Sequence, residues 1–231
     1  MKPLYIIPAR GGSKGIPRKN IKPLCGKPLL VYTVEAALTL APAERVVLTT
    51  DSEEIAAVGR SAGLTVDYMR PAELATDTAG SREVILDVMD YADAKGIDYD
   101  CVVLLQPTSP LRTPADIVAC QDLYASRMPD IDMAVTVCEA ACNPYYDCFE
   151  TGADGFLHVS KGDGTITRRQ DAPKAWEYNG AVYVINPASI RAMTLGQMPR
   201  RAASEMPRSR SVDLDTPLDW TIAEAIMKAQ S

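Results

Sequence analysis

Short apolar runs alternate with amphipathic stretches through the first half of the chain. The apolar runs have the length of buried strands and mostly polar or Gly/Pro flanks; they cover Leu4–Ile7, Arg45–Thr50, Leu64–Met69 and Asp100–Gln106. The intervening stretches repeat apolar residues at helical spacing and predict helices over Pro28–Leu40, Ser52–Ser61 and Ser81–Lys95. Such alternation with short links predicts a doubly wound, mostly parallel α/β sheet with helices on both faces. Ligands bind such sheets at the carboxyl ends of the strands.

The pattern changes between residues 139 and 177. Turn signals separate short alternating segments there, at Asn143-Pro-Tyr-Tyr, Thr151-Gly-Ala-Asp-Gly and Lys161-Gly-Asp-Gly-Thr. They predict hairpins, and the core pattern resumes at Tyr178–Ile185. We therefore expect one domain over 1–231 with an inserted excursion at 139–177. Its aromatic residues favour a packed surface, such as a subunit contact, over a floppy insertion; they are Tyr145, Tyr146, Phe149, Phe156 and Trp176.

Composition narrows the class of protein. The chain has 231 residues, of which 47% are hydrophobic and 23% charged, as in ordinary globular domains. It has no apolar run of membrane-spanning length and no signal-peptide core, so a cytoplasmic protein without a membrane partner is expected. A net charge of −6 argues against nucleic acid as a partner.

The six cysteines do not form the dense pattern of a disulfide framework. Cys138, Cys142 and Cys148 cluster, which raises the alternative of a zinc site. They include no CxxC pair, and the single histidine, His158, lies ten residues further on. Free thiols are therefore favoured.

Positive charge is concentrated at the start of the chain. The first 34 residues contain seven Lys or Arg and no acid, whereas the other 197 contain 17 basic and 30 acidic residues. The loop after Leu4–Ile7 carries Gly11, Gly12 and Gly15 together with Arg10, Lys14, Arg18 and Lys19. Glycines let backbone N–H groups approach phosphate oxygens, and the cations offset their charge. The spacing fits neither GxxxxGK[ST] nor GxGxxG. With these two motifs excluded, the remaining interpretation as a binding site is a wrapped loop that holds a triphosphate tail. The alternative is a solvated basic turn.

Two acidic residues near the end of the chain are candidate metal ligands. Asp213 and Asp215 point to the same side if their segment is extended. Paired carboxylates beside phosphates suit Mg²⁺. The alternative is that Asp215 caps the next helix and Asp213 is merely exposed. Thr216 and Pro217 also suit the start of that helix, and Asp51 is expected to cap the helix that follows it.

Further polar loops follow other predicted strands. Gln106–Arg112 contains two prolines, and its polar side chains are candidates for ligand contacts at the sheet edge. Arg70–Ser81 is a long link that ends at an expected N-cap. Arg168–Gln170 and Asn179 are candidates for contact with an anionic second substrate, whereas Arg200–Arg210 is predicted to be a solvated loop.

Five motifs in order resemble the acylneuraminate cytidylyltransferases, the CMP-sialic acid synthetase family, over nearly the whole chain. They are IPARGGSKGIPRKN (Ile7–Asn20), RPAELATDTAGS (Arg70–Ser81), LLQPTSPLR (Leu104–Arg112), RRQDAP…NGAVY (Arg168–Tyr183) and VDLDTPLDW (Val212–Trp220). One departure is Trp176, which stands where the family commonly has a tyrosine-like residue. Synthetases for the eight-carbon acid Kdo rank lower, because their opening loop lacks GGSKG.

The resemblance implies a Rossmann-like nucleotidyltransferase that transfers CMP from CTP to the anomeric hydroxyl of a nine-carbon 2-keto sugar acid and releases pyrophosphate. It implies a homodimer built through the excursion. The alternatives are an enzyme for Kdo or for a sugar or alcohol phosphate, and a non-catalytic nucleotide-binding regulator.

The resemblance also implies roles for individual residues. The implied phosphate contacts are Arg10, Lys14, Lys19 and Asn20, and those to cytosine and ribose are Arg70 and Ser81. Gln106 and Asn179 are implied substrate contacts, and Arg169 one to the sugar carboxylate, in cis or across a dimer. Asp213 and Asp215 would bind Mg²⁺, with one of them a candidate base. The implied catalytic set is Arg10, Lys19, Asp213 and Asp215.

Overall fold

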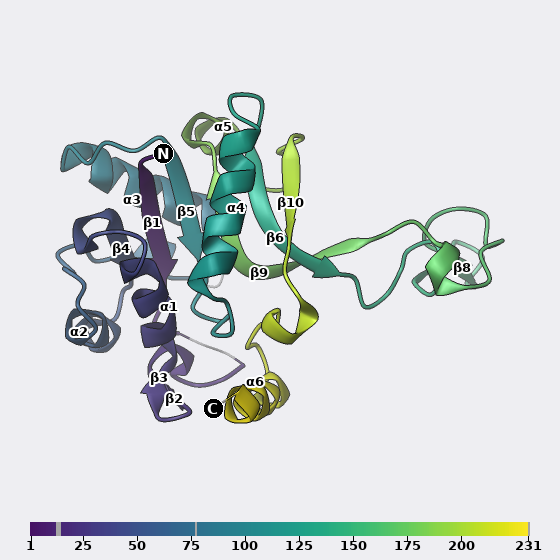
Figure 1. Ribbon diagram of the computed structural model, residues 1–231, viewed down its shortest axis with the longest axis horizontal. Coiled ribbons are helices and arrows are strands. Elements are labelled where there is room, and N and C mark those ends of the chain that lie inside the picture. The colour runs from purple at the N-terminus through teal and green to yellow at the C-terminus, as the bar shows by residue number, and fades with distance from the viewer. Residues whose placement is uncertain (13–14, 77, 231) are drawn as a thin grey trace.

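A six-stranded sheet forms the centre of the protein in the computed structural model, which describes residues 1–12, 15–76 and 78–230 (Figure 1). Its strands, in spatial order, are β10 (Arg201–Glu205), β6 (Met133–Glu139), β9 (Trp176–Ile185), β5 (Cys101–Leu105), β1 (Pro3–Pro8) and β4 (Val46–Thr49). The helices are α1 (Leu29–Leu38), α2 (Glu53–Ser61), α3 (Ser81–Ala94), α4 (Pro114–Ser126), α5 (Pro187–Ala192) and α6 (Pro217–Gln230). None of the helices formed by the described residues is long and apolar enough to cross a membrane.

The sheet is mostly parallel, as predicted. Strand β1 pairs in parallel with both β4 and β5, and β10 pairs in parallel with β6. Strand β9 runs antiparallel to both of its neighbours, β5 and β6. The carboxyl ends of β4, β1 and β5 therefore lie side by side at one edge, which is where ligands of such sheets bind.

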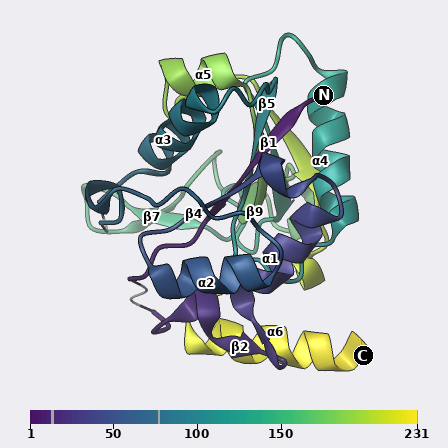
Figure 2. The same cartoon turned by 90° about the vertical axis from the view of Figure 1, so that its left-hand side faces the viewer.

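Helices cover both faces of the sheet (Figure 2). Along β1, Tyr5 and Ile7 face the core that contains residues of α1, α2 and α4, whereas Leu4 and Ile6 face the core of α3 and α5. This two-residue alternation places apolar side chains on both faces, which is why the strands read as continuous apolar runs.

The predicted strand Leu64–Met69 is wrong, although the structure describes all of it. The segment has no strand assignment, and the Arg70 N–H donates to Thr50 O beside the end of β4. Its polar side chains bond to α3 instead: Tyr68 contacts Asp87, and Asp67 accepts from Lys95 at 2.9 Å. These contacts draw the segment toward the helix and away from a strand ladder.

The predicted solvated loop Arg200–Arg210 is also wrong in part, because residues 201–205 form β10 at the sheet edge. Its flanking arginines bond to buried carboxylates. Arg200 donates to Asp132 at 3.0 Å, and Arg210 donates to Asp116 at 2.7 Å. Buried carboxylates need such partners, so this basic run is structural.

The excursion leaves the sheet after β6 and returns at β9. It contains one antiparallel hairpin, β7 (Phe149–Thr151) with β8 (Leu157–Val159), and it projects away from the body (Figure 1). A second small hairpin joins β2 (Pro23–Leu24) to β3 (Lys27–Pro28). The hairpin expected within 139–177 is thus present, and its role in dimerisation stays a prediction.

Asp132, just before β6, joins three elements. It is 1% exposed and accepts from the Ser189 hydroxyl at 2.7 Å and from the Arg200 N–H at 2.9 Å, in addition to the Arg200 guanidinium. The hydrogen bonds from Arg200 lower the pKa of Asp132 to about 2. The carboxylate therefore fastens α5 and β10 to β6 in its charged form.

Asp132→Asn is expected to lower the free energy of unfolding at neutral pH by about 1–3 kcal/mol, because buried donors lose a charged acceptor. The wild-type carboxylate gives its full stabilisation above its unfolded pKa, about 4, and loses it as the pH falls toward its folded pKa. The gap between wild type and variant should therefore narrow from about pH 4 downward. Urea unfolding at several pH values measures this.

Asp130→Asn is the matched control, because Asp130 lies 3.7 Å from the same Arg200 but is 88% exposed. It should change stability little. An equal loss in both variants would contradict the assignment.

Candidate active site

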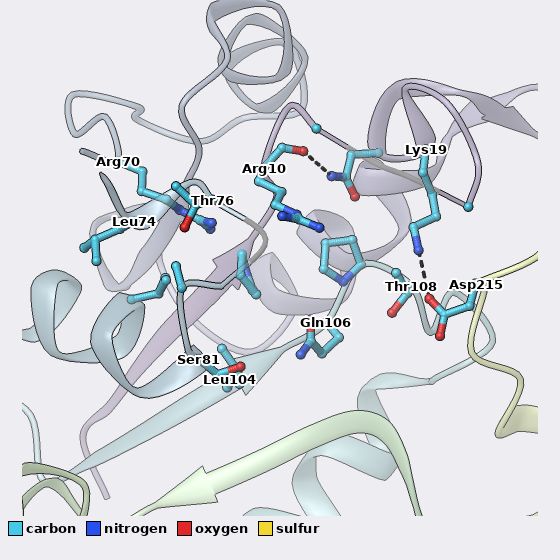
Figure 3. A pocket seen from close by; sticks show the side chains of 17 residues that line it. Arg10, Lys19, Arg70, Leu74, Thr76, Ser81, Leu104, Gln106, Thr108 and Asp215 are labelled. Carbon is cyan, nitrogen blue, oxygen red and sulfur yellow. Dashed lines mark hydrogen bonds and ion pairs between the residues drawn. The ribbon is translucent and has the colours of Figure 1, made fainter. Parts of the chain in front are cut away.

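A cavity of about 410 Å³ opens at the carboxyl ends of β1 and β5, where Pro8 and Gln106 line it; Figure 3 shows its side chains. Its walls come from described residues of the opening loop (9–12 and 15–22), of the 70–81 link (70–76 and 78–81) and of the loop that begins at Gln106. The cavity brings together most of the predicted site residues, namely Arg10, Lys19, Asn20, Arg70, Ser81, Gln106 and Asp215. Lys14 lies outside the described residues.

The opening loop folds back over the cavity. The Asn20 side chain is 6% exposed, and its amide donates to the Arg10 carbonyl at 3.1 Å. Asn20 therefore fixes the backbone of the loop, in addition to lining the cavity. In Figure 3, Arg70 and Lys19 lie on opposite sides of Arg10. Arg10 and Lys19 come from the opening loop and Arg70 from the 70–81 link, and all three line one cavity.

The opening loop closes against the segment before α6. Lys19 Nζ donates to Leu214 O at 2.6 Å and to Asp215 Oδ1 at 3.2 Å. A Cβ added to Gly15 would lie 2.1 Å from the Asp215 carbonyl oxygen, so only glycine fits there. A small apolar core seals this junction; it contains Ile16, Leu24, Leu29, Leu214, Trp220 and Ala223.

The segment that carries the two acids has no strand assignment and bends between them, so the condition that it be extended is not met. The Asp215 N–H donates to the Asp213 carbonyl at 3.1 Å. Thr216 caps α6 through the Asp219 N–H at 3.3 Å, as predicted, so Asp215 is not the cap. Asp215 instead lines the cavity beside Lys19.

Asp213 lies beside the cavity, outside the set of lining residues. Its Oδ2 would be 3.0 Å from a Cβ added to Gly180. Partial removal of the carboxyl group from water raises the pKa of Asp213, a hydrogen bond with Thr108 lowers it, and the charge of Asp215 raises it further. The two carboxylates are thus near enough to interact. Within the described ranges, no group of three His, Cys, Asp or Glu side chains that could hold a metal is found.

The other end of the cavity is formed by the 70–81 link. Arg70 is 7% exposed and donates to Thr49 Oγ1 at 3.0 Å and Thr49 O at 2.8 Å, and burial lowers its pKa. Ser81 lines the cavity as the first residue of α3. The expected N-cap at Ser81 is wrong, because the extended Gly80 occupies the cap position. Leu74, Val84 and Leu104 give this end apolar walls.

Arg112 supports the site from the core and does not face it. The guanidinium donates to Gln106 O at 3.1 Å, Ala181 O at 2.7 Å and Thr33 Oγ1 at 2.7 Å. Burial lowers its pKa to about 10. The expectation that Arg112 contacts ligand at the sheet edge is therefore wrong, whereas Gln106 does line the cavity.

Two predicted substrate contacts lie away from this cavity. Asn179 is 4% exposed; its Oδ1 accepts from the Thr136 hydroxyl at 2.7 Å, and its amide donates to Ser211 at 3.0 Å. It therefore holds β9 to its neighbours. Arg169 pairs with Asp147 at 2.7 Å within the excursion.

Asp51 shows what the sequence reasoning missed. It does not cap α2, because the Ser52 side chain accepts from the Ile55 N–H. Asp51 Oδ1 instead accepts from the Gly11 N–H at 2.8 Å. Local spacing cannot reveal this contact, since 40 residues separate the partners. The lining residue Thr76 was also missed, although it lies inside the 70–81 motif.

The mostly parallel sheet and the cationic cavity at its strand ends define an α/β protein with a nucleotidyltransferase-like fold. A family model described as cytidylyltransferase matches residues 4–147. The chain belongs to this cytidylyltransferase family.

Relatives with assigned names match nearly the whole chain. CMP-N,N'-diacetyllegionaminic acid synthase of Legionella pneumophila is 31% identical over 229 residues, which cover 99% of this chain and 97% of that protein. N-acylneuraminate cytidylyltransferase of Streptococcus agalactiae is 35% identical over 224 residues, which are 95% of this chain but 52% of that longer protein. A solved structure of CMP:2-keto-3-deoxy-manno-octonic acid synthetase complexed with CTP superposes over 100% of both chains with a TM-score of 0.72 at 18% identity. At that identity the superposition shows the fold alone.

Gly15→Ala is expected to reduce kcat/KM for CTP by about a hundred-fold, because the new methyl group would push the loop off the Asp215 carbonyl and misplace its cations. Release of pyrophosphate measures the rate. Gly196→Ala is the control, since a Cβ there meets nothing within 4 Å, and its rate should not change. Wild-type kcat/KM in Gly15→Ala would show that the contact does not shape the site.

Proposed function

We propose that the protein transfers CMP from CTP to the anomeric hydroxyl of a nine-carbon 2-keto sugar acid and releases pyrophosphate. The observation that carries the proposal is the division of the cavity into two ends (Figure 3). One end has cations and close backbone, with Lys19, Gly12 and Gly15. The other has apolar walls beside Ser81 and Arg70. A nucleoside triphosphate has the same division, with a charged tail and a flat, largely apolar base.

The relatives support the acceptor. The names of the legionaminic acid synthase and the N-acylneuraminate cytidylyltransferase both describe the joining of a cytidylyl group to an acidic sugar. They match 99% and 95% of this chain at 31% and 35% identity. We therefore propose the class of acceptor, a sialic-acid-like keto-sugar acid, and leave its ring substituents to a substrate panel.

Arg10 and Lys19 would act mainly through charge. Transfer to the α-phosphate builds negative charge on the phosphate oxygens and on the departing pyrophosphate, and cations fixed in a shielded site offset that charge. The Lys19 side chain is only 13% exposed and is held by Leu214 O. It is therefore oriented before substrate arrives, so little reorganisation is required.

Asp213 and Asp215 would hold Mg²⁺. Two carboxylates beside a triphosphate fit the ligand set of this ion, which uses one or two carboxylates together with phosphate oxygens. When bound, the ion would supply additional positive charge at the reacting phosphates. Gln106, on the adjacent loop, would face the sugar acid.

The excursion would form a homodimer. Three large apolar side chains on its hairpin are strongly exposed: Phe149 at 52%, Phe156 at 71% and Leu157 at 69%. Apolar groups gathered on a projecting hairpin mark an interaction site. A second copy of the chain would cover them.

With CTP and Mg²⁺, the protein should release pyrophosphate with one or more acids from a panel of N-acetylneuraminic, Kdn, legionaminic and pseudaminic acids.

Asp215→Ala should raise the Mg²⁺ concentration for half-maximal rate by about ten-fold or more, since even the loss of an outer-shell contact weakens metal binding by that factor. Asp98→Asn removes a similar charge from an exposed pair with Lys2 and should leave Mg²⁺ activation unchanged.

Kdo is assayed in parallel. The proposed acceptor would be refuted if no acid of the panel released pyrophosphate, or if only Kdo did. Unaltered Mg²⁺ activation in Asp215→Ala would refute the metal assignment while leaving the acceptor standing.

Wild-type protein should sediment at twice the 25.0 kDa chain mass. The double variant Phe156→Asp/Leu157→Asp should sediment as a monomer, because buried charges would disfavour the contact. Leu218→Asp is the matched control, since Leu218 is 67% exposed on α6 and outside the excursion, and it should remain a dimer. A monomeric wild type would exclude the dimer.

A further inference from the structure

We propose that Asp51 is a positioning residue that holds Gly11 and thereby aims Arg10 into the cavity. The inference rests on the proposed function only in taking Arg10 as a contact to the CTP phosphates. Asp51 comes from the end of β4 and reaches the opening loop across 40 residues of sequence.

The peptide units around Arg10 are fixed on three sides. The Ala9 N–H donates to Thr49 O at 3.0 Å, which extends the pairing of β1 with β4. The Arg10 carbonyl accepts from the Asn20 amide, and the next N–H, of Gly11, donates to Asp51 at 2.8 Å. Of these three bonds, the last has a carboxylate as its acceptor, and bonds to charged acceptors are the stronger ones.

Asp51 holds the loop from behind. Neither Asp51 nor Gly11 lines the cavity, whereas the adjacent residues Arg10 and Gly12 do. A Cβ added to Gly11 would lie 3.3 Å from the Ser52 Cβ and 3.7 Å from both Asp51 carboxylate oxygens. The loop therefore rests directly on the Asp51–Ser52 turn. The carboxylate leaves the ligand space free and acts through Arg10.

Charge supports the same role. Burial is the main cause that lowers the pKa of Arg70; the nearby Arg10 lowers it further, and the charge of Asp51 raises it. Asp51 thus lies within electrostatic reach of Arg70, which also senses Arg10, and these two guanidinium groups repel each other. A carboxylate behind the loop reduces the cost of holding these two neighbouring cations in the cavity before the triphosphate arrives.

A second contact joins the opening loop to α2, the helix that follows Asp51. Arg18 of the opening loop pairs with Glu54 in the first turn of α2. Both side chains of this pair are largely exposed, at 64% and 59%, and such pairs contribute little. Asp51 is exposed too, but its carboxylate accepts from a backbone N–H of the loop, whereas Glu54 bonds only to the end of the Arg18 side chain. The Asp51 contact is therefore the one expected to set the loop conformation.

Asp51→Ala and Asp51→Asn separate the hydrogen bond from other effects. Asparagine keeps an oxygen that can accept from the Gly11 N–H, whereas alanine does not. Asp51→Ala should reduce kcat/KM for CTP by about ten- to a hundred-fold, the range for loss of a bond to a charged acceptor. KM for the sugar acid should not change, and Asp51→Asn should recover part of the loss, because it keeps the acceptor oxygen but not the charge.

Ser52→Ala is the matched control from the same turn. It removes the N-cap of α2, so it should lower the melting temperature and leave kcat/KM for CTP unchanged. Asp51→Ala should show the reverse, a lower kcat/KM with a nearly unchanged melting temperature. Binding of CTP by calorimetry should weaken in Asp51→Ala in parallel with kcat/KM.

Wild-type kcat/KM in Asp51→Ala would overturn the inference, as would an equal loss in Asp51→Asn and Asp51→Ala. Failure of the wild type to bind or turn over CTP would instead refute the proposed function, so the two failures are distinguishable.

Discussion

The site depends on the contact between the opening loop and the segment that precedes α6. Lys19 Nζ reaches Leu214 O and Asp215 across 195 or more residues of sequence, and Gly15 packs directly on the Asp215 carbonyl. An ammonium group that is largely buried is tolerated only with partners of this kind. The apolar core around Leu214 and Trp220 keeps the two segments together. Without this junction, the carboxylates and the cations would belong to separate surfaces.

This junction also brings opposite charges into one cavity. Lys19 is engaged by Asp215, whereas the Arg10 backbone is fixed by the Asn20 amide and by Asp51 from behind. Arg112, buried below, holds the Gln106 carbonyl. Hydrogen bonds from neighbouring residues thus hold the groups that line the cavity, as is usual for sites that require accurate geometry. This support leaves one buried polar atom unsatisfied in the core, because Arg112 Nε has no hydrogen-bond partner in the described structure.

The sequence predicts most of the fold because two signals in it are local. Apolar periodicity gives the strands and helices of the first half, and Thr216 with Pro217 marks the start of α6. The failures come from contacts between distant residues. Leu64–Met69 has a strand-like pattern, but bonds from its polar side chains to α3 draw it away from the ladder. In the same way, Asp51 reads as a helix cap until the fold brings Gly11 to it.

The position of Arg169, the predicted contact to the sugar carboxylate, also depends on contacts that the local sequence does not reveal. Arg169 belongs to a recognised motif, yet its guanidinium pairs with Asp147 in the excursion, which projects away from the strand ends (Figure 1). The residue does not line the cavity of its own chain. If Arg169 recognises the sugar carboxylate, the geometry requires that it act on the cavity of a second copy. The proposed role of Arg169 therefore depends on the proposed dimer. If the protein were fully active as a monomer, neither Arg169 nor the exposed hairpin could be part of the site.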